Sequence, residues 1–184
     1  TFPVAVFIHG GGFTGKSRDI VLTDPNRLAD IKYFLENGIA YASIGYRLLE
    51  TTQQDTIGVI KCLTDSRRGL QFMRYYAQDL HINPAKVGLM GTSAGGGTSL
   101  WLATRSDMAD ASSSDPIEQV STRVSAAVMI GSQCSYDIYR WETDVYDDFD
   151  GMGTDYTFDS IVNLLSFPRA SNFYGGIDST NHIL

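Results

Sequence analysis

Histidine and cysteine are scarce in this 184-residue chain, and basic residues are fewer than acidic ones. The 14 lysines and arginines are scattered and stand against 21 acids, which gives a formal charge of -7. A nucleic-acid surface needs clustered basic side chains, so no nucleic-acid partner is predicted. The two cysteines, Cys62 and Cys134, lack the C-x-x-C spacing of metal and redox sites. They are expected to be buried thiols.

Long apolar runs are also absent, so no membrane span is predicted, because crossing a bilayer takes about 20 apolar residues. The segment Thr1 to Ile8 has neither the basic start nor the cleavage site of a signal peptide. It is already strand-like and lacks an initiator Met, which suggests that the beginning of the natural protein is missing. A content of 43% hydrophobic and 19% charged residues is typical of one soluble globular domain. Neither compartment nor oligomeric state is predicted.

Apolar runs alternate with helical patterns along the chain. Strands are expected at Pro3 to Ile8, Ile39 to Tyr46, Val87 to Met90 and Val124 to Ile130. Helices are expected at Pro25 to Glu36, within Thr56 to Leu80, and at Ala94 to Arg105. Such alternation implies right-handed crossovers, and hence an α/β domain with a doubly wound, mostly parallel sheet over residues 1–184. In the first helix, Leu28, Ile31 and Leu35 recur at helical spacing and predict an apolar face.

The stretch Gly91 to Gly95 reads G-x-S-x-G and lies between a predicted strand and a predicted helix. In this context the pattern is typical of a tight strand-to-helix turn that strains its central residue and presents the side-chain oxygen above the sheet edge. Glycines on either side remove Cβ atoms that would collide as strand and helix approach. Ser93 is therefore the candidate nucleophile. A solvent-facing serine in an ordinary glycine-rich turn is the alternative.

A second motif, His9 to Gly12, follows the first predicted strand. The carboxyl ends of parallel strands meet at one edge of the sheet, which is where ligands bind, so this motif and Ser93 are expected to share an edge. Acyl transfer needs backbone N–H groups aimed at the oxygen that becomes negative. Gly11, Gly12 and Ala94 are the candidate donors of this oxyanion hole.

Two nucleotide-binding patterns overlap the same glycines. Gly10-x-Gly12-x-x-Gly15 matches a dinucleotide fingerprint, and Gly10 to Ser17 matches the phosphate loop G-x-x-x-x-G-K-S. The first requires a helix that starts at the glycines and an acid after the next strand. Against the second, Asp24 and a proline interrupt the helix that should follow, and no strand ends in an Asp that could hold Mg²⁺. Both remain weaker alternatives.

With HGGGF at 9–13, YRL at 46–48, Asp65 on a helix and GTSAGG at 91–96, the chain resembles the hormone-sensitive-lipase-like carboxylesterases of the α/β-hydrolase fold. The resemblance covers roughly residues 2–130. It implies Ser93 as nucleophile and the N–H groups of Gly11, Gly12 and Ala94 as the oxyanion hole. It also implies hydrolysis of small carboxylic esters with neither a metal nor an organic cofactor. The domain is expected to be incomplete at both ends.

The base that takes the serine proton is the open point. In this fold the order is Ser, then an acid, then His, and only His182 follows Ser93. Asp178 lies close to it in sequence and is a weaker candidate for the acid.

Residues 137–175 are expected to form a cap-like or irregular segment rich in acids. A calcium loop near Asp148 is not predicted, because Tyr146 replaces the first ligand. A non-catalytic binding protein of the same fold therefore remains an alternative to the esterase.

Overall fold

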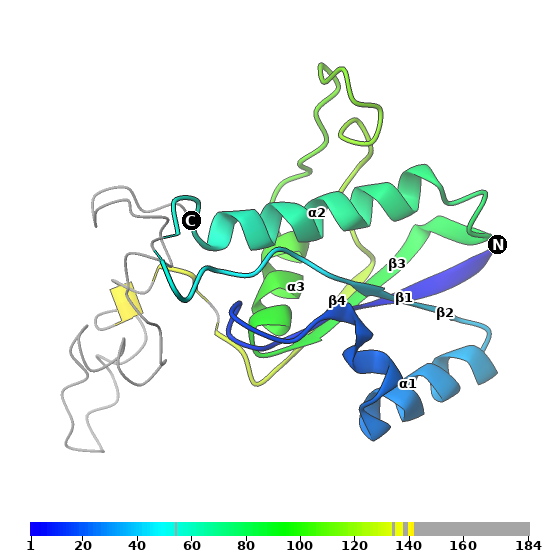
Figure 1. Ribbon diagram of the computed structural model, residues 1–184. Coiled ribbons are helices and arrows are strands. Elements are labelled where there is room, and N and C mark those ends of the chain that lie inside the picture. The colour runs from blue at the N-terminus through cyan, green and yellow to red at the C-terminus, as the bar shows by residue number, and fades with distance from the viewer. Residues whose placement is uncertain (54, 134, 138–139, 142–184) are drawn as a thin grey trace.

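The computed structural model describes residues 1–53, 55–133, 135–137 and 140–141 (Figure 1). Its strands are β1 (Phe2–Ile8), β2 (Ala40–Ile44), β3 (Ile82–Thr92) and β4 (Ala126–Ile130). Its helices are the 3-10 helix η1 (Arg18–Leu22), α1 (Pro25–Glu36), α2 (Val59–Tyr75) and α3 (Ala94–Thr104). The alternation expected from the sequence is confirmed. The strand before Ser93 is longer than predicted, since it begins at Ile82.

The strands form one sheet in the order β2-β1-β3-β4, and every pairing is parallel. The carboxyl ends of β1 and β3 lie side by side, because Ile8 pairs with Gly91. A parallel sheet requires crossover connections that place helices over its faces. In Figure 1, α2 and α3 lie over one face of the sheet and α1 lies over the other. This is the predicted doubly wound α/β fold.

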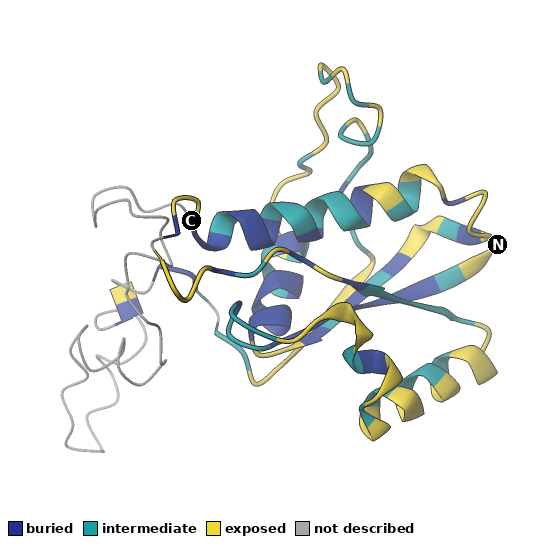
Figure 2. Cartoon of the chain, viewed as in Figure 1, coloured by how far each residue is buried: buried dark blue, intermediate teal, exposed yellow. Residues whose placement is uncertain are grey.

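The core lies between the sheet and α2 with α3. Apolar side chains of β1 are nearly inaccessible, with Val6 and Ile8 at 0% exposure, as are Leu63 and Leu70 of α2. Figure 2 shows this buried layer along β1 and α3, whereas most of α1 is exposed. Burial in the core fixes the position of β1, and it therefore also fixes the start of the loop that follows β1.

Helix α1 has the predicted bounds but not the predicted apolar face. The Asp24 side chain caps its first turn by accepting the N–H of Asn26 at 2.8 Å. Leu28 and Leu35, which recur at helical spacing, are 45% and 58% exposed and so lie outside the core. The half-buried side of the helix carries Arg27 instead, whose guanidinium lies 5.1 Å from the centre of the Phe7 ring.

Candidate active site

Ser93 occupies the turn between β3 and α3. Its φ of 56° and ψ of −127° lie outside the regions that ordinary L-residues adopt, a conformation that costs on the order of 1 to 3 kcal/mol. The backbone is held from several sides. The N–H of Ser93 donates to the carbonyl of Ile130 at 3.0 Å, and its carbonyl accepts from the Gly97 N–H at 3.0 Å and from the Ser132 hydroxyl at 2.6 Å. The side chain remains exposed, as a nucleophile must be.

The glycines flanking Ser93 are required by close backbone approach. A Cβ on Gly91 would lie 2.3 Å from the carbonyl carbon of Gly95. A Cβ on Gly95 would lie 1.9 Å from the carbonyl oxygen of Ile8, at the end of β1. Both distances are far inside van der Waals contact. The G-x-S-x-G pattern therefore permits α3 to start directly against the ends of β3 and β1.

The loop after β1 turns sharply at its glycines. Gly11 and Gly12 have φ values of 107° and 60°, which favour glycine. The Gly11 carbonyl accepts the N–H groups of Thr14 at 3.0 Å and Gly15 at 3.1 Å, which closes the turn. The N–H groups of Gly11 and Gly12 donate to no atom of the described residues. They are therefore available to an acceptor outside this loop.

One cavity of about 470 Å³ joins the two motifs, because Ser93, Gly11 and Gly12 all line it. Ala94 follows Ser93 as the first residue of α3, so its N–H has no acceptor within the helix. The structure thus brings together the candidate nucleophile and the loop of candidate oxyanion donors. It does so through the pairing of β1 with β3, as expected from the shared sheet edge.

Tyr46 lies directly behind the glycine loop. Its hydroxyl donates to the carbonyl oxygen of His9 at 2.8 Å, and its ring stacks on the His9 ring with centroids 4.2 Å apart. The His9 Nδ1 donates to the Gly10 carbonyl at 2.8 Å, which fixes the tautomer with the proton on Nδ1. Burial lowers the pKa of His9, so this imidazole is neutral at pH 7. His9 therefore supports the loop, and it lines a different cavity from Ser93.

The loop that starts with Tyr46 is tied down by an ion pair. The Arg47 guanidinium donates to both carboxylate oxygens of Asp65 at 2.8 Å each, and the Arg47 N–H adds a bond of 2.9 Å. Burial raises the pKa of Asp65, but these bonds and the Arg47 charge outweigh it and lower that pKa below its usual value. The next residues connect back to the site, since the Leu49 N–H donates to the Phe13 carbonyl at 2.8 Å.

Sequence reasoning did not identify Tyr46 as a site residue. It is 37 positions from His9, and only the pairing of β1 with β2 brings the two together. The available signal was its position just after a strand, at the edge of the sheet where ligands bind.

Neither His9 nor His81, the two described histidines, lines the cavity that holds Ser93. His81 is exposed and precedes β3, whereas Ser93 follows it, so about 30 Å of strand separates them. The later candidates, His182 and Asp178, lie outside the described residues, as do the residues around Asp148 and most of segment 137–175. Their roles stay predictions.

The two nucleotide-binding alternatives are wrong, because the structure does not have the helices that they require. In a phosphate loop, the lysine and the hydroxyl residue open the helix that follows. Here Lys16 has a φ of 67°, and Ser17 caps a five-residue 3-10 helix. No helix starts at Gly12 or Gly15 either, as a dinucleotide site requires.

In the described part of the chain, no helix combines the length and apolar character that a membrane crossing requires.

Comparison with known proteins places these observations in a family. The BD-FAE family model matches residues 1–155. Among solved structures, the acetyl ester-xyloside bifunctional hydrolase of Caldicellulosiruptor lactoaceticus is 26% identical, with a TM-score of 0.56, over 70% of this chain and 43% of that one. The propionate-bound esterase 2 of Thermogutta terrifontis is 24% identical, with a TM-score of 0.56, over 71% of this chain and 44% of that one. At this identity the comparison shows a similarity of fold alone.

One curated relative also matches. The 5-methylorsellinic acid synthase of Aspergillus terreus is 35% identical over 104 residues, which cover 55% of this chain and 4% of that protein. The chain thus spans less than half the length of these relatives. The expected resemblance is confirmed at the level of an esterase-like α/β-hydrolase domain, although the matching model is not the hormone-sensitive-lipase-like one. This chain belongs to the BD-FAE family of α/β-hydrolases.

Proposed function

We propose that this chain carries the nucleophile and the oxyanion hole of a serine carboxylesterase that cleaves small acyl or acetyl esters. The observation that supports this most is the cavity that Ser93 shares with Gly11 and Gly12, whose N–H groups have no acceptor among the residues that the structure describes. The hydrolase of Caldicellulosiruptor lactoaceticus, which is described as acting on acetyl esters, supports the choice of a small acyl group. The order of the HGGGF, YRL and GTSAGG motifs supports a lipase-like relationship.

The chemistry would proceed in two steps. The Ser93 hydroxyl oxygen attacks the ester carbonyl carbon, and its proton passes to a base. The carbonyl oxygen becomes negative and is held by the N–H groups of Gly11, Gly12 and Ala94, where each donor contributes on the order of 3 kcal/mol to the transition state. The alcohol leaves with a proton, and water then releases the acid from the acyl-serine. His182 is the candidate base and Asp178 the candidate acid. No metal or organic cofactor takes part in this scheme.

Turnover by the full-length protein tests the proposal. Purified protein should release p-nitrophenol from p-nitrophenyl acetate with a burst that matches the enzyme concentration. The Ser93→Ala variant should abolish this burst while retaining its far-UV circular dichroism. A Ser43→Ala variant is a suitable control, since Ser43 lies on β2 and donates to the Arg18 carbonyl at 3.0 Å. Equal bursts from the wild type and Ser93→Ala would refute the role of Ser93.

A second candidate is a non-catalytic binding protein with the same cavity. One observation favours it: within residues 1–53, 55–133, 135–137 and 140–141, no histidine lines the cavity that holds Ser93. This function predicts binding of small esters with no release of p-nitrophenol. Turnover above the rate of the Ser93→Ala variant would exclude it.

A further inference from the structure

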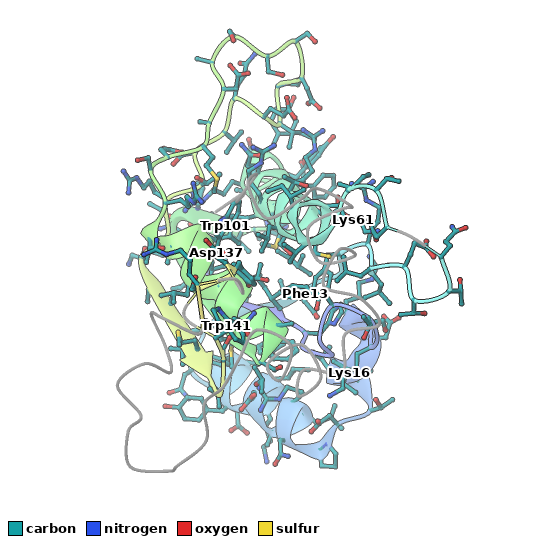
Figure 3. All side chains as sticks on the ribbon, turned by 90° about the vertical axis from the view of Figure 1, so that its left-hand side faces the viewer. Phe13, Lys16, Lys61, Trp101, Asp137 and Trp141 are labelled. Atoms are coloured by element: carbon teal, nitrogen blue, oxygen red, sulfur yellow. The ribbon has the colours of Figure 1, made fainter. Side chains whose placement is uncertain are left out.

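Lys16 lines the same cavity as Ser93, Gly11 and Gly12. It also lines a neighbouring cavity of about 540 Å³, which His9 and Tyr46 border from behind the glycine loop. Figure 3 marks Lys16 and Phe13, which both belong to the loop between β1 and η1. Lys16 therefore borders both the cavity of the candidate nucleophile and a second cavity at the same sheet edge.

The loop holds the Lys16 stem in place. A φ of 67° is uncommon for a residue other than glycine and fixes the direction in which the side chain leaves the backbone. The Cγ of Lys16 lies 3.2 Å from the position that a Cβ on Gly11 would take, so the stem packs against the oxyanion loop. The following residue, Ser17, accepts the Asp19 N–H at 3.2 Å and starts η1. The stem thus belongs to the segment that carries the candidate oxyanion donors.

The other charged groups of the cavity are already engaged. The Arg27 guanidinium lies 2.8 Å from an Asp30 carboxylate oxygen. The Asp24 carboxylate accepts the N–H of Asn26 at 2.8 Å as the helix cap. Lys16, in contrast, makes no ion pair or hydrogen bond with the residues that the structure describes. Lys16 is therefore the basic group of this cavity that has no acidic partner among the described residues, and it shares the cavity with the Asp24 carboxylate, whose charge the neutral N–H groups do not cancel.

The Lys16 charge acts on His9, which lines the neighbouring cavity. Burial is the main cause that lowers the pKa of His9, and the positive charge of Lys16 lowers it further. An anionic group bound in the cavity would experience the same charge as attraction. The chain as a whole has a formal charge of -7, so the positive charge of Lys16 is opposite in sign to the net charge of the chain.

We propose that Lys16 makes this site selective for esters that carry a carboxylate on their acyl or alcohol part. The ammonium would pair with that carboxylate while the ester carbonyl occupies the oxyanion hole. This inference rests on the proposed esterase function. Because the group is exposed, one such pair is expected to change selectivity about five-fold, which corresponds to about 1 kcal/mol.

Two isosteric substrate pairs test the inference on the full-length protein. The acyl part is probed by monomethyl succinate against methyl succinamate, and the alcohol part by p-carboxyphenyl butyrate against p-carbamoylphenyl butyrate. In at least one pair, the ratio of kcat/KM for acid over amide should fall about five-fold in Lys16→Met and further in Lys16→Glu. The Lys32→Met variant is the matched control, since Lys32 lies on α1 with its Nζ 3.8 Å from Glu36. Equal ratios in the wild type and Lys16→Met for both pairs would overturn the proposal.

Binding separates this inference from the esterase function. In a Ser93→Ala background, monomethyl succinate and p-carboxyphenyl butyrate can be titrated without turnover by Ser93. The Kd of at least one should rise about five-fold on adding Lys16→Met, and the difference should shrink in high salt. If neither Kd changes, the selectivity proposal fails even when neutral esters are hydrolysed. If selective binding persists but no ester is cleaved, the esterase proposal fails alone.

Discussion

The Tyr46 hydroxyl donates a 2.8 Å hydrogen bond to the carbonyl oxygen of His9, across the interface between the chain after β2 and the chain after β1. The same hydroxyl lies 3.4 Å from the Gly10 carbonyl oxygen. The phenol therefore contacts two successive carbonyls just before the glycines that line the Ser93 cavity. Burial raises the pKa of Tyr46 well above its usual range, so it remains a donor at all working pH values. Tyr46 is a positioning residue for the proposed oxyanion hole.

Replacing Tyr46 with Phe should lower kcat and leave KM nearly unchanged. The His9 carbonyl would lose its donor, and an unsatisfied buried group costs about 1 to 3 kcal/mol. The glycine N–H groups would then be held less firmly toward the oxyanion, which forms only in the transition state. Steady-state kinetics with p-nitrophenyl acetate measure both constants.

Tyr41→Phe is the matched control. The Tyr41 hydroxyl on β2 is buried without a hydrogen-bond partner among the described residues, and burial raises the pKa of Tyr41 to about 12. Removing this hydroxyl should leave kcat unchanged and cause no loss of stability. If Tyr46→Phe matched Tyr41→Phe in kcat, the positioning role of Tyr46 would be wrong.

Gly95→Ala should prevent the turn at Ser93 from forming. Its Cβ would lie 1.9 Å from the Ile8 carbonyl oxygen, which belongs to the backbone of a buried strand and cannot move aside cheaply. We expect a loss of at least about 3 kcal/mol in the free energy of unfolding, from urea denaturation. Gly15→Ala, where a Cβ would meet nothing within 4 Å, should be neutral or stabilise by less than about 1 kcal/mol. Similar losses in both variants would contradict the close approach of α3 to β1.

The buried ion pair between Asp55 and Lys61 should make stability depend on pH. Burial raises the pKa of Asp55, but the Lys61 ammonium and the N–H groups of Glu50, Ile57 and Gly58 outweigh it and hold that pKa far below its usual value. The unfolded chain has a carboxyl pKa of about 3.9. The pair therefore stabilises the fold above that pH, and the contribution is lost as the pH falls toward the folded pKa.

Asp55→Asn tests this dependence. The variant leaves the Lys61 ammonium buried without its counter-charge, so it should lose about 3 kcal/mol at pH 7. Urea denaturation at a series of pH values should show the gap to wild type narrowing below about pH 4. A gap that stays constant from pH 7 to pH 2 would mean that the pair does not carry the stability assigned to it.

The arrangement of the site follows from the sequence because it depends on local signals. The Asp24 cap and the Asn37-Gly38 stop define α1, and glycines on either side of Ser93 define the turn. The shared edge of the two motifs follows from parallel pairing alone. These features need no knowledge of distant contacts.

Features that depend on distant contacts could not be predicted in the same way. Leu28 and Leu35 have helical spacing, but α1 uses the side with Arg27 and Phe34 toward the sheet. Tyr46 becomes part of the site only through strand pairing across 37 positions. Whether Lys16 is the basic residue of the cavity without an acidic partner depends on which acids pair with the other basic residues, such as Arg27 with Asp30. These pairs exist only in the folded chain.

Covalent labelling of Ser93 is the most direct test of the central claim. The full-length protein is treated with a fluorophosphonate probe, and tandem mass spectrometry locates the adduct. The account predicts one adduct per chain on Ser93, which is absent in Ser93→Ala and slower to form in Tyr46→Phe. Labelling that persists in Ser93→Ala, or no labelling of a folded full-length protein, would contradict it.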